Sequence, residues 1–146
     1  MTNQRTHHLQ LAHAVLDWNR RHLNRDSVLT EALIGECFAE HFIVEPNGRR
    51  YEANPANYLE FLNGMKAGME GIDYEIDHAL VDGTSVTFSM RARISYADGR
   101  RELFRAMLLM RFNDAGKVTL WHEVYVPIAL PPETTTHSQP EFRMQR

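Results

Sequence analysis

The sequence predicts an α+β domain in which three N-terminal helices pack on a curved antiparallel sheet, and three observations predict it. Apolar residues recur at helical spacing from His8 to Leu23. Apolar and polar residues alternate through the second half of the chain, beginning at Ile72. Turn segments containing Asp and Gly divide that half into strands, which is typical of successive hairpins in an antiparallel meander.

Two further helices are expected before the sheet. Asp26 and Ser27 can cap the first of them, which should end near His41, because their side-chain oxygens accept hydrogen bonds from free amides. Residues 42–44 then form a short strand, and residues 45–48, Glu-Pro-Asn-Gly, form a turn.

Asn54 and Pro55 begin the last of the three helices, since proline is tolerated at the first helical position. One face of this helix carries apolar residues at intervals of four, three and four: Tyr58, Leu62, Met65 and Met69.

The alternation assigns each strand residue to one face of the sheet. In the first strand of the meander, Ile72, Tyr74, Ile76, His78 and Leu80 share a face. The last strand, Val118 to Val126, puts Trp121, Glu123 and Tyr125 on one side. Its other side is also apolar, with His122 among Leu120, Val124 and Val126. Because helices can cover only one face, we expect a homodimer through the outer face.

Length and composition set the remaining limits. A chain of 146 residues with 43% hydrophobic residues fits one domain, assigned to residues 1–130, with a flexible tail at 131–146. The formal charge of -3 includes no basic block, so nucleic acid is not an expected partner. Cys37 is alone, which favours a reducing cytoplasm, and no apolar stretch is long enough for a membrane helix.

Two short segments carry a resemblance to a known family. Phe-Ala-Glu-His at 38–41 precedes the first strand, and Gly-Lys-Val at 116–118 precedes the last. With three helices before a four-stranded meander, the chain resembles the nuclear transport factor 2-like superfamily and its SnoaL-like branch from Leu9 to Pro127. The resemblance implies a cone-shaped, cystatin-like fold around a mostly apolar pocket. It also implies cofactor-free chemistry, because the superfamily includes ketosteroid isomerases, polyketide cyclases and epoxide hydrolases, together with binding proteins.

The resemblance points to two carboxylates. Glu45 before Pro46 matches the general base of the ketosteroid isomerases, but their two oxyanion donors fall near Trp18 and Leu108, which disfavours steroid isomerisation. The segment 116–123 is similar to the last strand of the limonene epoxide hydrolases and puts Glu123 at a catalytic carboxylate. The partners of that carboxylate would fall at or beside Met90 and Ala92, which disfavours epoxide hydrolysis.

Glu123 is the leading candidate for acid–base chemistry, because a carboxyl between aromatic residues should have a raised pKa. A structural carboxylate is the alternative for Glu123, and a solvated turn residue is the alternative for Glu45. His122 should face away from the pocket, and the histidines lack metal-site spacing, so no metal is expected. The expected ligand-binding residues are Trp18, Leu62, Met65, Met90, Phe104, Leu108, Trp121 and Tyr125.

Three functions remain open from the sequence. The first is a cofactor-free cyclase, isomerase or lyase acting on a hydrophobic carbonyl compound, with Glu123 moving a proton. The second is a non-catalytic carrier or sensor of a small hydrophobic molecule. The third is a dimerisation module whose cone is filled by its own side chains, such as Met90, Phe104 and Leu108.

Overall fold

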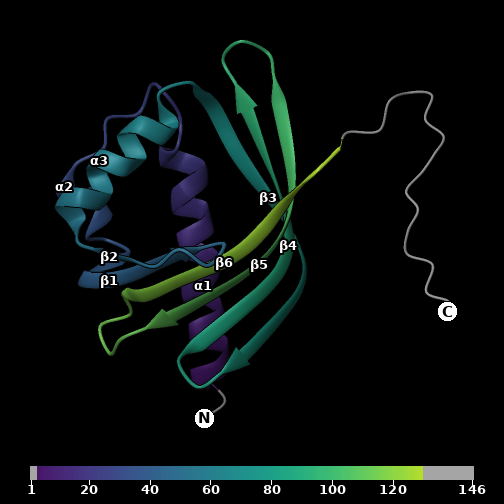
Figure 1. Cartoon of the computed structure of the whole chain (residues 1–146). Coiled ribbons are helices and arrows are strands. Elements are labelled where there is room, and N and C mark those ends of the chain that lie inside the picture. The colour runs from purple at the N-terminus through teal and green to yellow at the C-terminus, as the bar shows by residue number, and fades with distance from the viewer. Residues whose placement is uncertain (1–2, 130–146) are drawn as a thin grey trace, which may run out of the picture.

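A six-stranded sheet wraps around the helices in the computed structural model, which describes residues 3–129 (Figure 1). The predicted tail, 131–146, lies outside the described residues. The elements, in chain order, are α1 (Asn3–His22), α2 (Glu31–Ile34), β1 (Phe38–Pro46), β2 (Tyr51–Ala53), α3 (Pro55–Lys66), β3 (Met69–Asp82), β4 (Ser85–Tyr96), β5 (Arg101–Phe112) and β6 (Val118–Ile128).

The strand order is β2-β1-β6-β5-β4-β3. The predicted meander is present, because β3, β4, β5 and β6 pair with one another as successive antiparallel neighbours. The expectation of a purely antiparallel sheet is wrong, because β1 pairs parallel with β6 and antiparallel with β2. The sheet is therefore mixed, and the last strand in sequence lies in its interior.

The second helix differs most from its prediction. It is a single turn, capped by Thr30, whose side chain accepts a hydrogen bond from the Leu33 amide at 3.1 Å. Ser27 does not cap it, because its hydroxyl donates to the His22 carbonyl at 2.8 Å. Residues 38–41 belong to β1, where Phe38 is 2% exposed and its ring packs against neighbouring aromatic residues. Packing in the sheet therefore replaces the helix that the apolar spacing predicted.

The third helix begins where the sequence predicts. Asn54 is its N-cap: the Asn54 side chain accepts from the Asn57 amide, and the Asn57 side chain accepts from the Asn54 amide, both at 2.9 Å. Tyr58 and Leu62 are buried, as the apolar face predicts, whereas Met65 is 36% exposed. Met69 is buried but lies in β3, after the helix has ended at Lys66.

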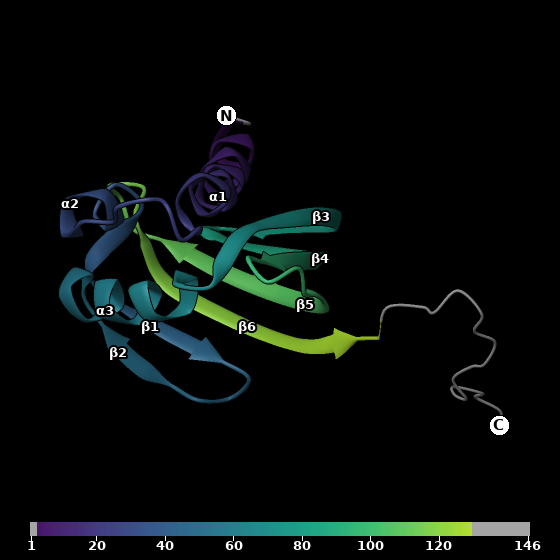
Figure 2. The same ribbon diagram turned by 90° about the horizontal axis from the view of Figure 1, so that it is seen from above.

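All three helices lie on one side of the curved sheet, as Figures 1 and 2 show together. Helix α1 packs against β3 and β4, and α3 contacts β1, β3 and α2. The inward side chains of β4, β5 and β6 are those that the alternation assigned to one face. Those at most 8% exposed are Val86, Phe88, Met90, Ala92, Ala106, Leu108, Met110, Phe112 and Trp121. Val118 is also fully buried, although strict alternation would place it opposite to Trp121, because the pairing of β5 with β6 shifts between Phe112 and Arg111.

Strand β3 changes face at a bulge. The pairing with β4 shifts between Ile76 and His78, so that Asp77 is the additional residue. Ala79 then packs against the core, and Leu80 is 68% exposed. The predicted common face of Ile76, His78 and Leu80 is wrong because one extra residue reverses the alternation beyond it. Asp77 accepts hydrogen bonds on the outer face from Arg91 of β4 and from Arg105 of β5.

The outer face carries exposed apolar side chains, in agreement with the alternation of β6. Met107 and Val124 are direct cross-strand partners, with 52% and 53% of their surface exposed. Val126 is 55% exposed on the same face. No helix among residues 3–129 has the combination of length and apolar character needed to cross a membrane.

The two faces of β5 should differ sharply in their sensitivity to mutation. We expect Leu108→Ala to lower the free energy of unfolding by about 2–5 kcal/mol, because Leu108 is fully buried and truncation leaves a cavity. Met107→Ala, one residue away on the exposed face, should change it by about 0.5 kcal/mol or less. Urea denaturation of both variants measures this difference, and equal losses would contradict the assignment of faces.

Candidate functional site

Strand β6 places the Glu123 carboxyl on the helix-covered face of the sheet. Glu123 pairs with Leu108 of β5 and with Pro46 of β1, so its backbone is held on both sides. Its side chain is partly buried and accepts a hydrogen bond from the indole nitrogen of Trp121, with 2.7 Å between Nε1 and Oε1. Residues two apart on a strand share a face, and this contact therefore follows directly from the alternation.

Burial of Glu123 raises its pKa above the ordinary carboxyl value, because removal from water disfavours the charged form. The hydrogen bond from Trp121 acts in the opposite direction, since it stabilises the carboxylate, but burial is the larger effect. The carboxyl therefore keeps its proton to a higher pH than an exposed glutamate does. Such a group can exchange a proton with a ligand near neutrality more readily than an ordinary carboxylate.

Two buried phenols lie within the electric field of Glu123. Burial raises the pKa of Tyr58 and of Tyr74, and the charge of Glu123 adds to the increase in both. Both hydroxyls therefore remain protonated at neutral pH. Tyr74 accepts a hydrogen bond from the side-chain amide of Asn19 on α1 at 2.9 Å. Apolar periodicity puts both tyrosines on faces directed towards the core, but nothing in the sequence distinguishes them from packing residues.

The turn that follows β1 is hydrogen-bonded to β6 at Glu123 and Tyr125. The Asn47 amide donates to the carbonyl of Glu123 at 2.8 Å, and the Asn47 side chain accepts from the Tyr125 amide at 2.8 Å. Asn47 and Gly48 have φ values of 49° and 88°, which asparagine and glycine adopt more readily than other residues. The turn predicted over residues 45–48 is therefore shorter than expected: Glu45 and Pro46 belong to β1, and Asn47 and Gly48 form the turn. Its two hydrogen bonds hold the segment of β6 that directly follows the Glu123 side chain.

The predicted ligand-binding residues divide by depth. Trp18, Leu62, Met90 and Leu108 are at most 2% exposed, and the indole of Trp18 donates to the Leu33 carbonyl at 3.2 Å. These four residues therefore belong to the packed core. The third hypothesis, a cone filled by its own side chains, expects such packing, and these four residues fit it. Trp121 is 8% exposed beside Glu123.

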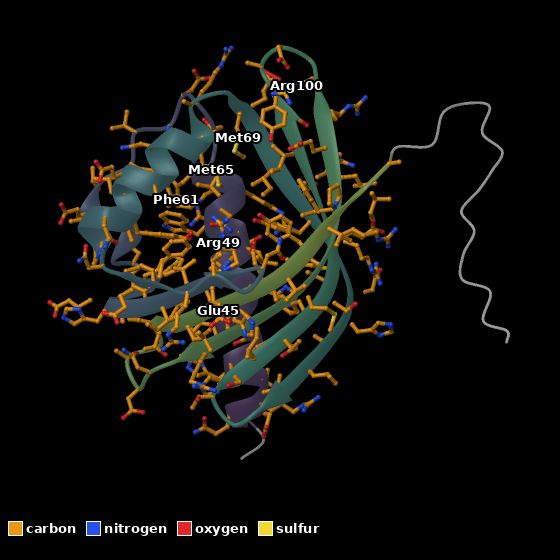
Figure 3. The ribbon with its side chains drawn as sticks, in the orientation of Figure 1. Glu45, Arg49, Phe61, Met65, Met69 and Arg100 are labelled. Carbon is orange, nitrogen blue, oxygen red and sulfur yellow. The ribbon has the colours of Figure 1, made fainter. Side chains whose placement is uncertain are left out.

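The more accessible apolar residues lie on β5, β6 and α3. Tyr125 and Phe104 are partly exposed, with their rings at right angles and their centroids 5.4 Å apart. On α3, Phe61 is 56% exposed and Met65 is 36% exposed one turn later, as Figure 3 labels them. These residues, rather than the buried four, are the apolar surface that a molecule can touch without displacing the core.

Glu45 does not share a site with Glu123. It pairs with His122 across the β1–β6 ladder, so both side chains project from the outer face. One Glu45 oxygen lies 3.6 Å from His122 Nε2, and the other lies 3.6 Å from Arg50 Nη1. His122 faces away from Glu123, as predicted, and the two candidate carboxyls lie on opposite faces of the sheet. Figure 3 labels Glu45 on β1.

Two surface hollows lie along β3 and β4, and neither includes a predicted site residue. The larger has a volume of about 470 Å³ and is lined by Arg20, Glu70, Gly71, Ile72, Asp73, Arg93 and Ser95. The smaller has a volume of about 200 Å³ and is lined by Asp73, Tyr74, Glu75, Arg91, Ala92, Arg93 and Leu103. Their charged groups are partly paired within the protein, as between Arg20 and Asp73 at 2.8 Å.

Between residues 3 and 129, His, Cys, Asp and Glu side chains form no cluster of three suited to a metal ion.

A protein-family model described as the SnoaL-like domain matches residues 15–121, which is more than half of the chain. The protein therefore belongs to the SnoaL-like domain family, in agreement with the resemblance of its sequence. The comparison with curated proteins finds no match.

Solved structures of the nuclear transport factor 2-like type are similar in fold. A candidate SnoaL-like polyketide cyclase from Shewanella denitrificans has a TM-score of 0.69 and 12% identity, with 82% of this chain and 90% of that chain covered. An NTF2-like protein from Anabaena variabilis has a TM-score of 0.65 and 17% identity, with 81% and 88% covered. An LEH-like epoxide hydrolase from M. tuberculosis has a TM-score of 0.65 and 16% identity, with 84% of each chain covered. Identities this low show a shared fold and leave the chemistry open.

The raised pKa of Glu123 predicts a stability that depends on pH. Since the pKa is higher in the folded state, the folded protein holds this proton more tightly, and ionisation of Glu123 lowers the free energy of unfolding. This loss of unfolding free energy should be absent at pH values well below 4.5, the ordinary pKa of a glutamate. It should grow as the pH rises from there to the pKa of Glu123 in the folded state, and it should stay constant at higher pH. Glu123→Gln, which cannot ionise and can still accept from Trp121, should remove it.

Urea denaturation between pH 4 and pH 8 checks this expectation. The lower limit is about half a unit below the ordinary glutamate pKa, and the upper limit is several units above it. The stability of Glu123→Gln relative to the unmodified protein should increase with pH across this range. Glu52→Gln, at an exposed position on β2, is the matched control and should show no such trend. A difference between Glu123→Gln and the unmodified protein that is independent of pH would contradict the raised pKa.

Proposed function

We propose that this protein binds a small apolar molecule with an oxygen-containing group against the helix-covered face of its sheet, and that Glu123 moves a proton on that molecule. The observation that supports this most strongly is a partly buried carboxyl with a raised pKa, held by Trp121 among aromatic side chains. The reaction class is a cofactor-free isomerisation, cyclisation or elimination of a hydrophobic carbonyl compound.

The proposed step needs no group beyond the ligand and Glu123. The ionised carboxyl takes a proton from the carbon next to a carbonyl, and the electron pair of the broken C–H bond moves into the enolate. The protonated carboxyl then returns the proton to another carbon, which gives the isomer, or to the original carbon. Partial exclusion of water by Trp121, Tyr125 and Phe104 keeps the raised pKa and limits exchange with solvent.

A specific observation favours a second function. Glu45 lies on the opposite face, so the two carboxyls predicted from the sequence cannot act as an acid–base pair on one ligand. A single carboxyl is sufficient to orient a bound molecule by hydrogen bonding. The alternative is therefore a carrier or sensor of a small hydrophobic ligand, in which Glu123 contributes affinity without chemistry.

We also propose that the protein acts as a homodimer in the cytoplasm. Met107, Val124 and Val126 give the outer face an apolar centre that a second copy of the same face could cover. Cys37 is a free thiol, which suits a reducing compartment. Burial raises the pKa of this thiol to about 11, so it is not a reactive thiolate at neutral pH.

Proton exchange on a ketone probe tests the proposed chemistry. We expect the protein to accelerate the exchange of α-hydrogens of 2-tetralone for deuterium in D₂O, and Glu123→Gln to reduce this acceleration by about 10²- to 10⁴-fold. Mass spectrometry of the recovered ketone gives the rate. Glu52→Gln should leave the rate unchanged, and Glu45→Gln tests the other predicted carboxyl in the same assay. Binding of 2-tetralone without exchange would favour the carrier, and no effect of Glu123→Gln on exchange would refute the role of its carboxyl.

The proposed dimer makes a separate prediction. Val124→Glu would bury two charges where the copies meet, so we expect it to convert a dimer into a folded monomer. Light scattering coupled to size-exclusion chromatography measures the molar mass. Val28→Glu, at an 80% exposed apolar residue away from the sheet, is the control and should leave the dimer intact. A monomeric unmodified protein at micromolar concentration would exclude this interface.

A further inference from the structure

In the part of the chain that the structure describes, the hydroxyl of Tyr58 has no hydrogen-bond partner. The tyrosine lies on α3 and is 9% exposed, and its ring contacts the rings of Phe38, Phe42 and Phe61 at centroid distances of 5.1, 5.2 and 5.9 Å. The hydroxyl of Tyr74, a partly buried phenol, accepts a hydrogen bond from the Asn19 side chain, whereas that of Tyr58 forms none among residues 3–129.

The unpaired hydroxyl is not sealed inside the core. In the described part of the chain, the side-chain polar atom that is both fully occluded and unpaired is Nε of Arg91. The Tyr58 oxygen is also unpaired but is not fully occluded, so a small part of its surface is accessible. A nearly buried O–H group without an acceptor loses hydrogen bonding to water, and a ligand oxygen can restore that bond.

Tyr58 and Glu123 belong to one contiguous cluster. Phe38 contacts Tyr58 at 5.1 Å and Trp121 at 6.3 Å between ring centroids, and Trp121 donates to Glu123. The charge of Glu123 contributes to the raised pKa of Tyr58, which places the two groups within electrostatic reach of each other. The phenol is therefore a permanent donor in the same cluster as a carboxyl that accepts when it is ionised.

The exposed edge of the cluster indicates the shape of the ligand. The rings of Tyr58 and Phe61 are nearly parallel, at 21°, and Phe61 is 56% exposed. Phe61 and Met65 therefore form an exposed apolar surface on α3, of which Phe61 stacks on the Tyr58 ring (Figure 3). A flat ring system can lie on this surface with its oxygen directed towards Tyr58.

We infer that Tyr58 is a specificity-determining residue that selects flat, apolar molecules with an acceptor oxygen, of the aryl ketone or cyclic enone class. Its O–H donates to the ligand oxygen and keeps its proton throughout. This inference rests on the proposed ligand surface around Glu123, and it assigns a donor and a ligand class to that surface. A hydrocarbon of the same shape leaves the hydroxyl unpaired and binds more weakly.

A pair of probes that differ in one acceptor tests this selection. The probes are 2-acetylnaphthalene, which has a carbonyl, and 2-isopropylnaphthalene, which has a similar shape without an acceptor. We expect the unmodified protein to bind the ketone about 3- to 10-fold more tightly, the net effect of one neutral hydrogen bond. Tyr58→Phe should abolish this preference by weakening ketone binding alone, whereas Tyr51→Phe, at an exposed phenol on β2, should retain it. Naphthalene fluorescence titration gives both dissociation constants.

The outcomes separate this inference from the proposed function. A ketone preference that survives in a folded Tyr58→Phe protein would overturn the role of Tyr58, even where Glu123→Gln abolishes exchange. Loss of the preference in Tyr58→Phe, together with exchange that does not depend on Glu123, would support Tyr58 and reject the proton transfer. Failure of the unmodified protein to bind either probe would overturn the ligand class. Urea denaturation of Tyr58→Phe shows whether the variant is folded.

Discussion

The two-residue alternation of β6 is the constraint on which the site depends. It directs Trp121, Glu123 and Tyr125 towards the helices and directs His122 and Val124 outwards. The strand cannot slip by one residue without burying the outward set and exposing the inward set. Hydrogen bonding to β1 on one side and β5 on the other holds this register, so the carboxyl stands on one of the most constrained strands of the sheet.

A carboxyl in this position balances two opposing effects. Burial disfavours its charge, and the indole of Trp121 partly compensates by donating to it. A glutamate with several strong donors would be permanently ionised and would be a poor base, whereas one without a donor would be costly to ionise. The single donor leaves Glu123 between these limits, with a pKa above the ordinary carboxyl value, which suits the proton transfer that we propose. The adjacent phenols keep their protons and so add polarity without adding charge.

Turn and helix-capping residues in the sequence predicted those parts of the fold that depend on neighbouring residues alone. The Asp-Gly turns located the meander, and Asn54 with Pro55 located the start of α3. The parallel pairing of β1 with β6 joins distant segments, so nothing near Phe38 in the sequence reveals that it belongs to a strand. The bulge at Asp77 also has no local sign, because the alternation continues through it without interruption.

In the candidate site, too, local patterns predicted some features, and long-range packing determined the others. Alternation was sufficient to direct Glu123 inwards, but the face of Glu45 depends on its register against β6, which is a tertiary property. Residue depth was also not predictable, since Met90 and Met65 are both apolar at core spacing and only packing distinguishes their exposure. The unpaired hydroxyl of Tyr58 is a property of its surroundings, and no pattern of residue types contains it.

The position of β6 inside the sheet has a consequence for how the chain acquires its structure. Phe38 pairs with Val118, so β1 lacks its parallel neighbour β6 until nearly all of the domain has left the ribosome, although it can already pair with β2. Closing so long a loop is entropically unfavourable before its contacts form, which slows folding of sheets with distant pairings. During synthesis, the hairpins β3–β4 and β4–β5 can assemble first, whereas the strand that bears Glu123 joins the two halves at the end.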